Sequence, residues 1–175
     1  MNTPLKSKSL NAVRDLFVFS CFTGLAYVDL CNLTNQQIVK TDDGTFWLHT
    51  SRQKTGNDTK IPLLDVPLKI IEKYKVTGSN GRVFPMKGRC CTNRQLKKIA
   101  KLCGVERHLT FHMSRHTFAT ETCLSQGVPI ETVSRMMGHK RLNTTQIYAK
   151  ITHSKVNEEM EALSEKLTGK YFFVS

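Results

Sequence analysis

The sequence lacks a hydrophobic run long enough to cross a membrane. Its longest apolar stretch, residues 16–27, contains Ser20, Thr23 and Gly24 and falls well short of the roughly 20 apolar residues that a spanning helix needs. Residues 1–11 are polar and show no hydrophobic core followed by a cleavage site, unlike a signal peptide. Hydrophobic residues make up 39% of the 175 residues and charged residues 23%, which also argues against disorder. We expect one folded domain in the cytoplasm, without membrane contact.

Paired metal-binding motifs are missing too. The six cysteines include no C-x-x-C pair, and we expect them to be reduced and mostly buried. His108, His112 and His116 recur at every fourth position near Cys103, which leaves a zinc site open as an alternative. No paired-cysteine motif or H-E-x-x-H motif accompanies them. We therefore predict neither a metal ion nor a cofactor.

Acidic residues are scarce. The chain has 26 Lys and Arg against 14 Asp and Glu, a formal net charge of +12. The excess is concentrated in residues 61–110, which contain eleven Lys and Arg and three Asp and Glu. A basic segment of this kind indicates a polyanionic partner, most commonly nucleic acid, although a solvated basic face without a partner is the alternative.

Hydrophobic periodicity predicts a mainly α fold with a small three-stranded antiparallel sheet (α+β). The expected strands, 38–40, 45–50 and 60–64, are short and separated by turn-forming residues, which places the sheet at about 37–64. The helical patterns cover 10–22, a turn around Asp29, 68–76, 92–103, 114–126, 130–137, 144–150 and an amphipathic stripe over 156–167. Internal repeats and low-complexity segments are absent from the sequence.

Residues able to carry chemistry gather in the C-terminal half. His112 and Arg115 are three positions apart, so a helix beginning there places them on one face. His139 follows a helix that ends at a glycine, and Tyr148 comes nine residues later. Lys54 lies in the second hairpin. Taken singly, each has a structural alternative: a half-buried tyrosine, a solvated turn lysine, or a histidine bonded to the main chain.

The order and spacing of these residues are more specific. Phe22-Thr23-Gly24-Leu25-Ala26-Tyr27-Val28-Asp29 is followed by Lys54, His112-Met113-Ser114-Arg115-His116-Thr117-Phe118-Ala119-Thr120, Gly138-His139 and Thr145-Gln146-Ile147-Tyr148. This pattern resembles the tyrosine recombinase (phage integrase) family over about residues 10–165. It is most similar to the integrases of Bacteroidetes-type conjugative and mobilizable elements.

The resemblance implies a site-specific recombinase that needs neither metal nor ATP. Tyr148 would attack a DNA phosphodiester to form a 3′-phosphotyrosyl bond and release a 5′-hydroxyl. His112 would handle protons and contact the phosphate, and Arg115 would clamp its non-bridging oxygens. His139 would stabilise the transition state, and Lys54 would be the general acid for the leaving oxygen. A type IB topoisomerase shares this chemistry but would not exchange partner strands.

One position departs from the family pattern. The family's first arginine follows Thr-Gly-Leu, where this sequence has Ala26, while Asp29 matches the acidic residue that the family keeps three positions later. Losing one preorganised charge typically costs around 10²–10³ in rate. Arg14 and Arg52 are the arginines before residue 80, and we expect Arg14, on the same helix as the motif, to be the substitute. The alternative is a DNA-binding relative with little or no cleavage activity.

The resemblance also implies an organisation and a set of partners. We expect a catalytic domain over 1–152 and a C-terminal helix and tail over 153–175. The apolar stripe of this helix either packs on a neighbouring protomer, in an exchange between protomers, or covers the chain's own core. We also expect a fragment, without the family's N-terminal core-binding and arm-binding domains. Implied partners are double-stranded DNA at attachment sites, other protomers in a tetramer, and accessory DNA-bending proteins in the nucleoid. The expected phosphate contacts are Arg52, Arg89, Arg94, Lys97, Lys98 and Lys101.

Overall fold

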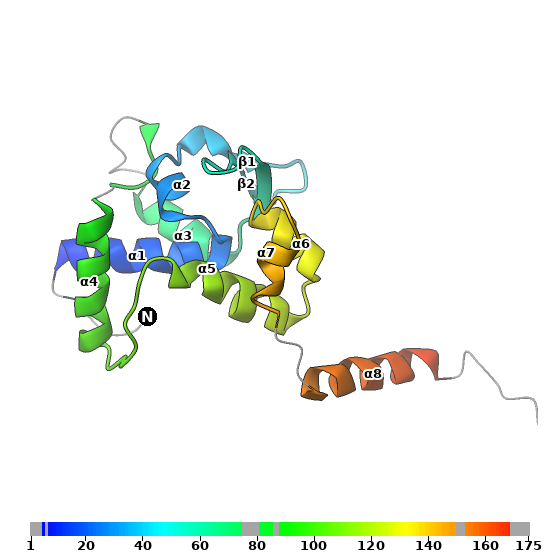
Figure 1. Ribbon diagram of the computed structural model, residues 1–175. Coiled ribbons are helices and arrows are strands. Elements are labelled where there is room, and N and C mark those ends of the chain that lie inside the picture. The colour runs from blue at the N-terminus through cyan, green and yellow to red at the C-terminus, as the bar shows by residue number, and fades with distance from the viewer. Residues whose placement is uncertain (1–4, 6, 75–80, 86–87, 150–152, 169–175) are drawn as a thin grey trace, which may run out of the picture.

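A small antiparallel sheet lies at one edge of a group of helices in the computed structural model, which describes residue 5 and residues 7–74, 81–85, 88–149 and 153–168 (Figure 1). The strands are β1 (Ile38–Lys40), β2 (Phe46–Ser51) and β3 (Asp58–Pro62). The longer helices are α1 (Lys8–Thr23), α3 (Asp65–Tyr74), α4 (Arg89–Leu102) and α8 (His153–Leu167). The shorter ones are α2 (Tyr27–Cys31), η1 (Asn35–Gln37), α5 (Met113–Thr117), η3 (Phe118–Cys123), η4 (Leu124–Gln126), α6 (Ile130–Met136) and α7 (Asn143–Gln146). The predicted mainly α fold with three strands is confirmed.

Helix α1 forms the centre of the main hydrophobic core. It packs against α3, α4 and α5, and Leu16 and Phe19 are almost fully buried. The helix ends at Gly24, which has a left-handed φ of 65°. A Cβ at Gly24 would lie 2.4 Å from Cδ1 of Phe118. Only glycine therefore allows the end of α1 to approach the segment that follows α5 this closely.

The sheet has the strand order β1-β2-β3, with both pairs antiparallel. Leu48 in β2 lies opposite Ile38 in β1 and Ile61 in β3. Leu48 and Ile61 are buried, so one face of the sheet belongs to the core. Strand β3 also contacts α6. The sheet thus brings the β2–β3 hairpin next to the C-terminal helices.

The segment 113–126 differs from the single α-helix that periodicity predicts. Its middle, η3, is a π-helix, and its end, η4, is a 3₁₀-helix. The segment still ends at Gly127, as predicted, with a φ of 81°. Widened π turns are rare in proteins, and those that occur often lie near functional sites. Here the π turn carries Phe118 and Ala119 into a second small core, which they share with Val133, Met137 and Tyr148.

Smaller corrections concern helix ends and thiols. Helix α7 begins at Asn143 rather than after it, and Leu142 is its N-cap. Lys150, and residues 75–76 of the helix expected over 68–76, lie outside the described residues. The expectation of mostly buried cysteines is wrong, because only Cys21 and Cys123 are buried. The described helices include none with the length and apolarity to span a bilayer.

Candidate active site

Arg115 lies where three segments meet. Its side chain is buried and donates hydrogen bonds to the carbonyl oxygens of Gly24, at the end of α1, and Met137, after α6 (3.2 Å). Burial and the neighbouring guanidinium of Arg52 lower the pKa of Arg115 to about 10, so it remains cationic at neutral pH. The structure therefore fixes one guanidinium group at the centre of the C-terminal half.

His139 contacts Arg115 directly. Its Nε2 lies 3.4 Å from Nη2 of Arg115, and its Nδ1 lies 2.8 Å from Oγ1 of Thr145. Because arginine has only donors, Nε2 accepts in this contact, which leaves the proton on Nδ1 to be donated to Thr145. Burial, followed by the charges of Arg115 and Arg52, lowers the pKa of His139 to about 4. The imidazole is therefore neutral at physiological pH.

Tyr148 lies beside His139 and His116. Its side chain is buried, with 9% of the residue exposed, and its ring stacks at 14° on that of His139, with centroids 6.4 Å apart. A closer partner is His116, whose ring meets that of Tyr148 edge to face at 4.7 Å. The sequence predicts the proximity of Tyr148 and His139, but assigns no role to His116.

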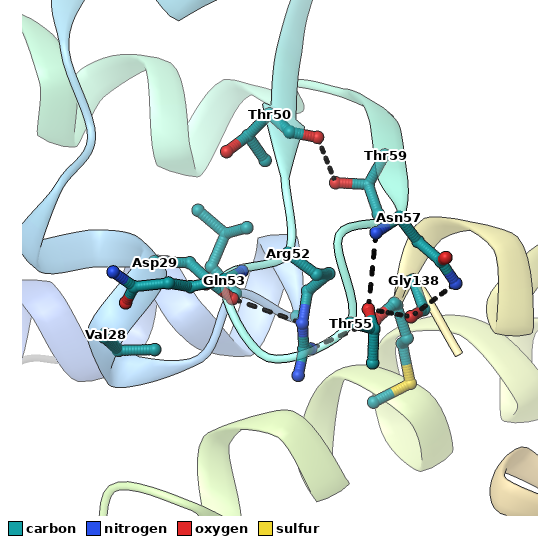
Figure 2. Close-up of polar contacts among 12 residues, drawn as sticks. Val28, Asp29, Thr50, Arg52, Gln53, Thr55, Asn57, Thr59 and Gly138 are labelled. Atoms are coloured by element: carbon teal, nitrogen blue, oxygen red, sulfur yellow. Dashed lines mark hydrogen bonds and ion pairs between the residues drawn. The ribbon is translucent and has the colours of Figure 1, made fainter. Parts of the chain in front are cut away.

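Arg52 lies in an environment that the sequence alone does not reveal. The sequence predicts a phosphate contact for Arg52, and the structure shows that the residue is only 9% exposed. Its Nε lies 3.3 Å from Oδ2 of Asp29, and its Nη1 donates to the carbonyl oxygen of Met137 at 3.0 Å. Asp29 also accepts a hydrogen bond from the main-chain amide of Gln53. Figure 2 shows Arg52 directed toward Asp29 from the hairpin that follows β2.

The same hairpin is attached to the loop that carries His139. Thr55 Oγ1 and Asn57 Nδ2 donate to the carbonyl oxygen of Gly138, at 3.2 Å and 3.3 Å (Figure 2). Gly138 has a φ of 63°, and a Cβ there would lie 2.4 Å from Cγ of Arg52 and 2.7 Å from Cγ2 of Thr59. A side chain at residue 138 would therefore collide with the stem of Arg52.

His112 lies at the open side of the site. It is the N-cap residue of α5 and is exposed. Together with Arg89 and Arg115 it lines a cavity of about 360 Å³ that has Ala26 in its wall. Burial, then the charges of His116, Arg115 and the more distant arginines, lower the pKa of His112. The cavity thus opens beside three groups that can bind an anion.

A model of the phage integrase family matches residues 2–155. The chain belongs to the phage integrase family. A tyrosine recombinase of Agathobacter rectalis is 30% identical over 178 residues, covering 93% of this chain and 55% of the relative. The tyrosine recombinase XerA of Pyrococcus horikoshii is 34% identical over 154 residues, covering 79% and 50%. The chain therefore spans about half the length of these curated relatives.

Solved structures of recombinases share the fold. XerH recombinase in a post-cleavage complex with its difH substrate superposes with a TM-score of 0.72 at 18% identity, covering 92% of this chain and 48% of that one. The Tn1549 transposon integrase bound to transposon right-end DNA gives a TM-score of 0.68 at 20% identity, covering 91% and 61%. The expected tyrosine recombinase catalytic-domain fold is confirmed.

Among the residues that the family resemblance singles out, the structure brings Arg115, His139 and Tyr148 together, with His112 beside them. Lys54 is exposed on the hairpin between Arg52 and Thr55. Arg14 is elsewhere: its guanidinium pairs with Asp15 at 3.1 Å, and Asp15 also binds Tyr74 of α3. The arginine that meets Asp29 is Arg52, so the structure does not bring Arg14 to this site.

The three histidines with four-residue spacing do not share one helix. His108 lies before α5, His112 is its N-cap, and His116 lies within it. The described residues include no group of three His, Cys, Asp or Glu side chains arranged to hold a metal ion. What the site does contain is two buried guanidinium groups, three imidazoles and one phenol.

Proposed function

We propose that this chain is the catalytic domain of a site-specific DNA recombinase that cleaves and rejoins strands through a 3′-phosphotyrosyl intermediate. The observation that carries this proposal is the position of the buried Tyr148 ring, stacked on the neutral His139, which itself contacts the cationic Arg115. A tyrosine beside fixed guanidinium groups has the two elements that phosphoryl transfer needs, a nucleophile and preorganised positive charge.

In the proposed reaction, the Tyr148 oxygen bonds to phosphorus and gives up its proton to His112, while the bond from phosphorus to the 5′-oxygen breaks and that oxygen takes a proton from Lys54. Arg115 binds the non-bridging oxygens, which carry more negative charge as attack proceeds. His139, neutral with its proton on Nδ1, accepts from Arg115 and thereby fixes the guanidinium. His112, exposed at the mouth of the site, contacts the phosphate and exchanges protons there.

Arg52 replaces the family's first arginine in this proposal. Ala26 offers no charge, but Arg52 reaches Asp29, which matches the family's acidic residue, from a different element and bonds the same carbonyl of Met137 as Arg115 does. Its charge reaches the site, because it contributes to the lowered pKa values of both Arg115 and His139. We therefore assign the second guanidinium to Arg52 rather than to Arg14.

Lys54 is the proposed general acid. The hairpin is anchored on both sides of this lysine, by Arg52 to Met137 and by Thr55 to Gly138. The lysine itself is exposed, so its amine is free to reach the leaving 5′-oxygen of a bound strand. Anchoring the main chain lowers the entropic cost of placing a flexible lysine beside the phosphate.

Helix α4 supplies the proposed DNA-binding face. Its first residue, Arg89, lines the cavity beside the site, and Arg94, Lys97, Lys98 and Lys101 are exposed farther along the helix. Opposite them, Leu96 and Ile99 are buried. Positive charge therefore extends from the site along one exposed helix face, as phosphate contacts along a duplex require.

The C-terminal helix is the proposed contact between protomers. Four apolar side chains of α8 are exposed: Val156, Met160, Leu163 and Leu167. In Figure 1 the helix extends away from the other helices. We propose that its apolar face packs on another recombinase protomer in a tetramer on DNA. Membership of the phage integrase family supports a further proposal: the protein acts in the cytoplasm, on nucleoid DNA, to integrate or excise a mobile element with accessory DNA-bending proteins.

Covalent trapping tests the proposal. A duplex nicked close to the cleavage position loses its short 5′-hydroxyl fragment after attack, so the intermediate accumulates. We expect an SDS-stable adduct with the chain at low ionic strength, and none with Tyr148→Phe, which keeps the ring and removes the hydroxyl. An adduct that persists in Tyr148→Phe would contradict the assignment. Duplex binding without any adduct would support the alternative of a DNA-binding relative.

A second assay distinguishes recombination from topoisomerase activity. After cleavage, a recombinase joins the 3′-phosphotyrosyl end to the 5′-hydroxyl of a partner duplex, whereas a topoisomerase rejoins the original strand. Two intact duplexes that carry the same site, one of them labelled, should give hybrid products. Relaxation of supercoiled DNA without hybrid products would indicate a topoisomerase.

A further inference from the structure

His116 lies between two residues of the proposed site. It is on α5, one turn after His112, and the two imidazole rings meet at 88° with centroids 5.3 Å apart. On its other side it meets the Tyr148 ring at 79° and 4.7 Å. The steps proposed above assign His116 no task, although its ring is closer to the nucleophile than that of His139.

Tyr148 depends on its neighbours for orientation. The residue follows α7, which has only four residues, Asn143–Gln146, and such a short helix cannot hold a side chain rigidly by itself. The nearly parallel, offset stacking on His139 restrains the tilt of the phenol ring. The perpendicular contact with His116 restrains it in a second direction, because edge-to-face pairs lose their attraction when either ring turns.

We propose that His116 is a positioning residue for the nucleophile, which holds the Tyr148 ring in the orientation from which its oxygen attacks phosphorus. This inference rests on the proposed function. In this inference, His116 acts on the ring of Tyr148 and does not act on the phosphate. Replacing it should therefore slow attack by tyrosine and leave both DNA affinity and the guanidinium groups at the phosphate unchanged.

The exposure of His116 makes this inference testable. The side chain is exposed, so truncating it leaves no cavity in the core and should not unfold the chain. His116→Ala removes the ring contact, and His116→Phe retains an aromatic ring that cannot exchange a proton. His108→Ala is the matched control, because His108 is also an exposed histidine and lies in the loop before α5.

The first measurement is the single-turnover rate of adduct formation with the nicked duplex at saturating protein. Since an edge-to-face ring pair contributes only modestly to interaction free energy, we expect His116→Ala to slow adduct formation about 2- to 13-fold. His116→Phe and His108→Ala should stay within about 2-fold of the unmodified chain. A normal rate in His116→Ala, in a preparation whose unmodified chain forms adduct, would overturn the inference and leave the proposed function standing.

The second measurement removes the tyrosine from the reaction. In Tyr148→Phe, hydrogen peroxide can serve as a small nucleophile: its oxygen bonds to phosphorus, the bond to the 5′-oxygen breaks, and that oxygen takes up a proton. Adding His116→Ala to Tyr148→Phe should leave this cleavage unchanged, whereas adding Arg115→Ala should abolish it. Equal slowing of peroxide and tyrosine attack by His116→Ala would show that His116 acts on the phosphate, and would overturn the inference. Absence of adduct from the unmodified chain would contradict the proposed function itself.

Discussion

Arg52 and Arg115 donate hydrogen bonds to the same main-chain oxygen, that of Met137, at 3.0 Å and 3.2 Å. One guanidinium comes from the β2–β3 hairpin and the other from α5, more than sixty residues apart in the sequence. Burial, and after it the charge of Arg52, lower the pKa of Arg115, so the two guanidinium groups repel each other. A phosphate that accepts from both groups would relieve this repulsion, so the arrangement favours an anionic ligand.

Replacing Arg52 should impair catalysis far more than replacing Arg14. Loss of one preorganised donor to a developing oxyanion typically costs about 10²–10³ in rate, so we expect a decrease of that size in adduct formation by Arg52→Ala. Arg14 pairs with Asp15 on α1, and Arg14→Ala should leave the rate nearly unchanged. Both variants are compared on the nicked duplex. A large loss in Arg14→Ala with normal activity in Arg52→Ala would reverse our assignment.

Gly138 should tolerate no side chain. In Gly138→Ala the Cβ would meet Cγ of Arg52 at 2.4 Å, and alanine also disfavours the left-handed backbone. We expect a loss of about 2–5 kcal/mol in the free energy of unfolding, the sum of backbone and packing costs. Urea denaturation measures this loss.

Gly127→Ala is the matched control for that prediction. Gly127 also has a positive φ, 81°, but a Cβ there would meet nothing within 4 Å. It should cost only the backbone term, about 1–2 kcal/mol, and retain adduct formation. Equal losses in the two variants would mean that the contact with Arg52 is unimportant.

Stability should depend on pH through His139. Its native pKa is about 4, below the ordinary value of 6.5, because of burial and the two nearby arginines. Between these values the unfolded chain binds more protons than the native chain. The free energy of unfolding should therefore decline as pH falls from 6.5 towards 4. Above pH 6.5 the contribution of His139 to this free energy should be fully present.

Urea denaturation at several pH values checks this prediction, with His139→Gln as the comparison. Glutamine does not titrate, so the variant should show a shallower pH dependence. It should not be flat, because the pKa of His112 is also lowered. An unchanged slope in His139→Gln would contradict the prediction.

The lysines of α4 should govern the salt dependence of DNA binding. Each phosphate contact contributes about 0.9 to the slope of log K against log salt on duplex DNA. Replacing Lys97, Lys98 and Lys101 with alanine should reduce the slope by up to three such contributions. Lys69→Ala, at an exposed position of α3, is the control and should leave the slope unchanged. A triple variant with an unaltered slope would exclude α4 from the interface.

The sequence predicts most of the fold because its periodic patterns are local. The strand at residues 38–40 is predicted to the residue, and the long helices differ from prediction by a few residues at their ends. The π turn of η3 is missed because it arises from packing: Phe118 must fit beneath Gly24, and no local pattern records that contact. The exposed Cys90 and Cys103 are missed because composition does not fix the orientation of a side chain.

The site is predicted where the motif spacing constrains it, and missed where residues meet through tertiary structure. Arg115, His139 and Tyr148 carry the family pattern and do meet. Arg52 is the exception, since a hairpin arginine gives no local sign of burial. The sequence did contain one sign of a buried arginine from elsewhere. Asp29 is retained although the family's arginine is replaced by Ala26, so a buried Asp29 carboxylate needs a cation from another element. Arg14 is nearer in sequence, but it lies more than two helical turns away along α1, where it pairs with Asp15.

The most direct test of the account is to locate the covalent bond to DNA. After incubation with the nicked duplex, the chain is digested with nuclease and protease, and its peptides are analysed by mass spectrometry. We predict a nucleotide attached through a 3′-phosphate to Tyr148, and no such peptide from Tyr148→Phe. A nucleotide on any other residue, or an unmodified Tyr148 in chains that have demonstrably cleaved the duplex, would contradict it.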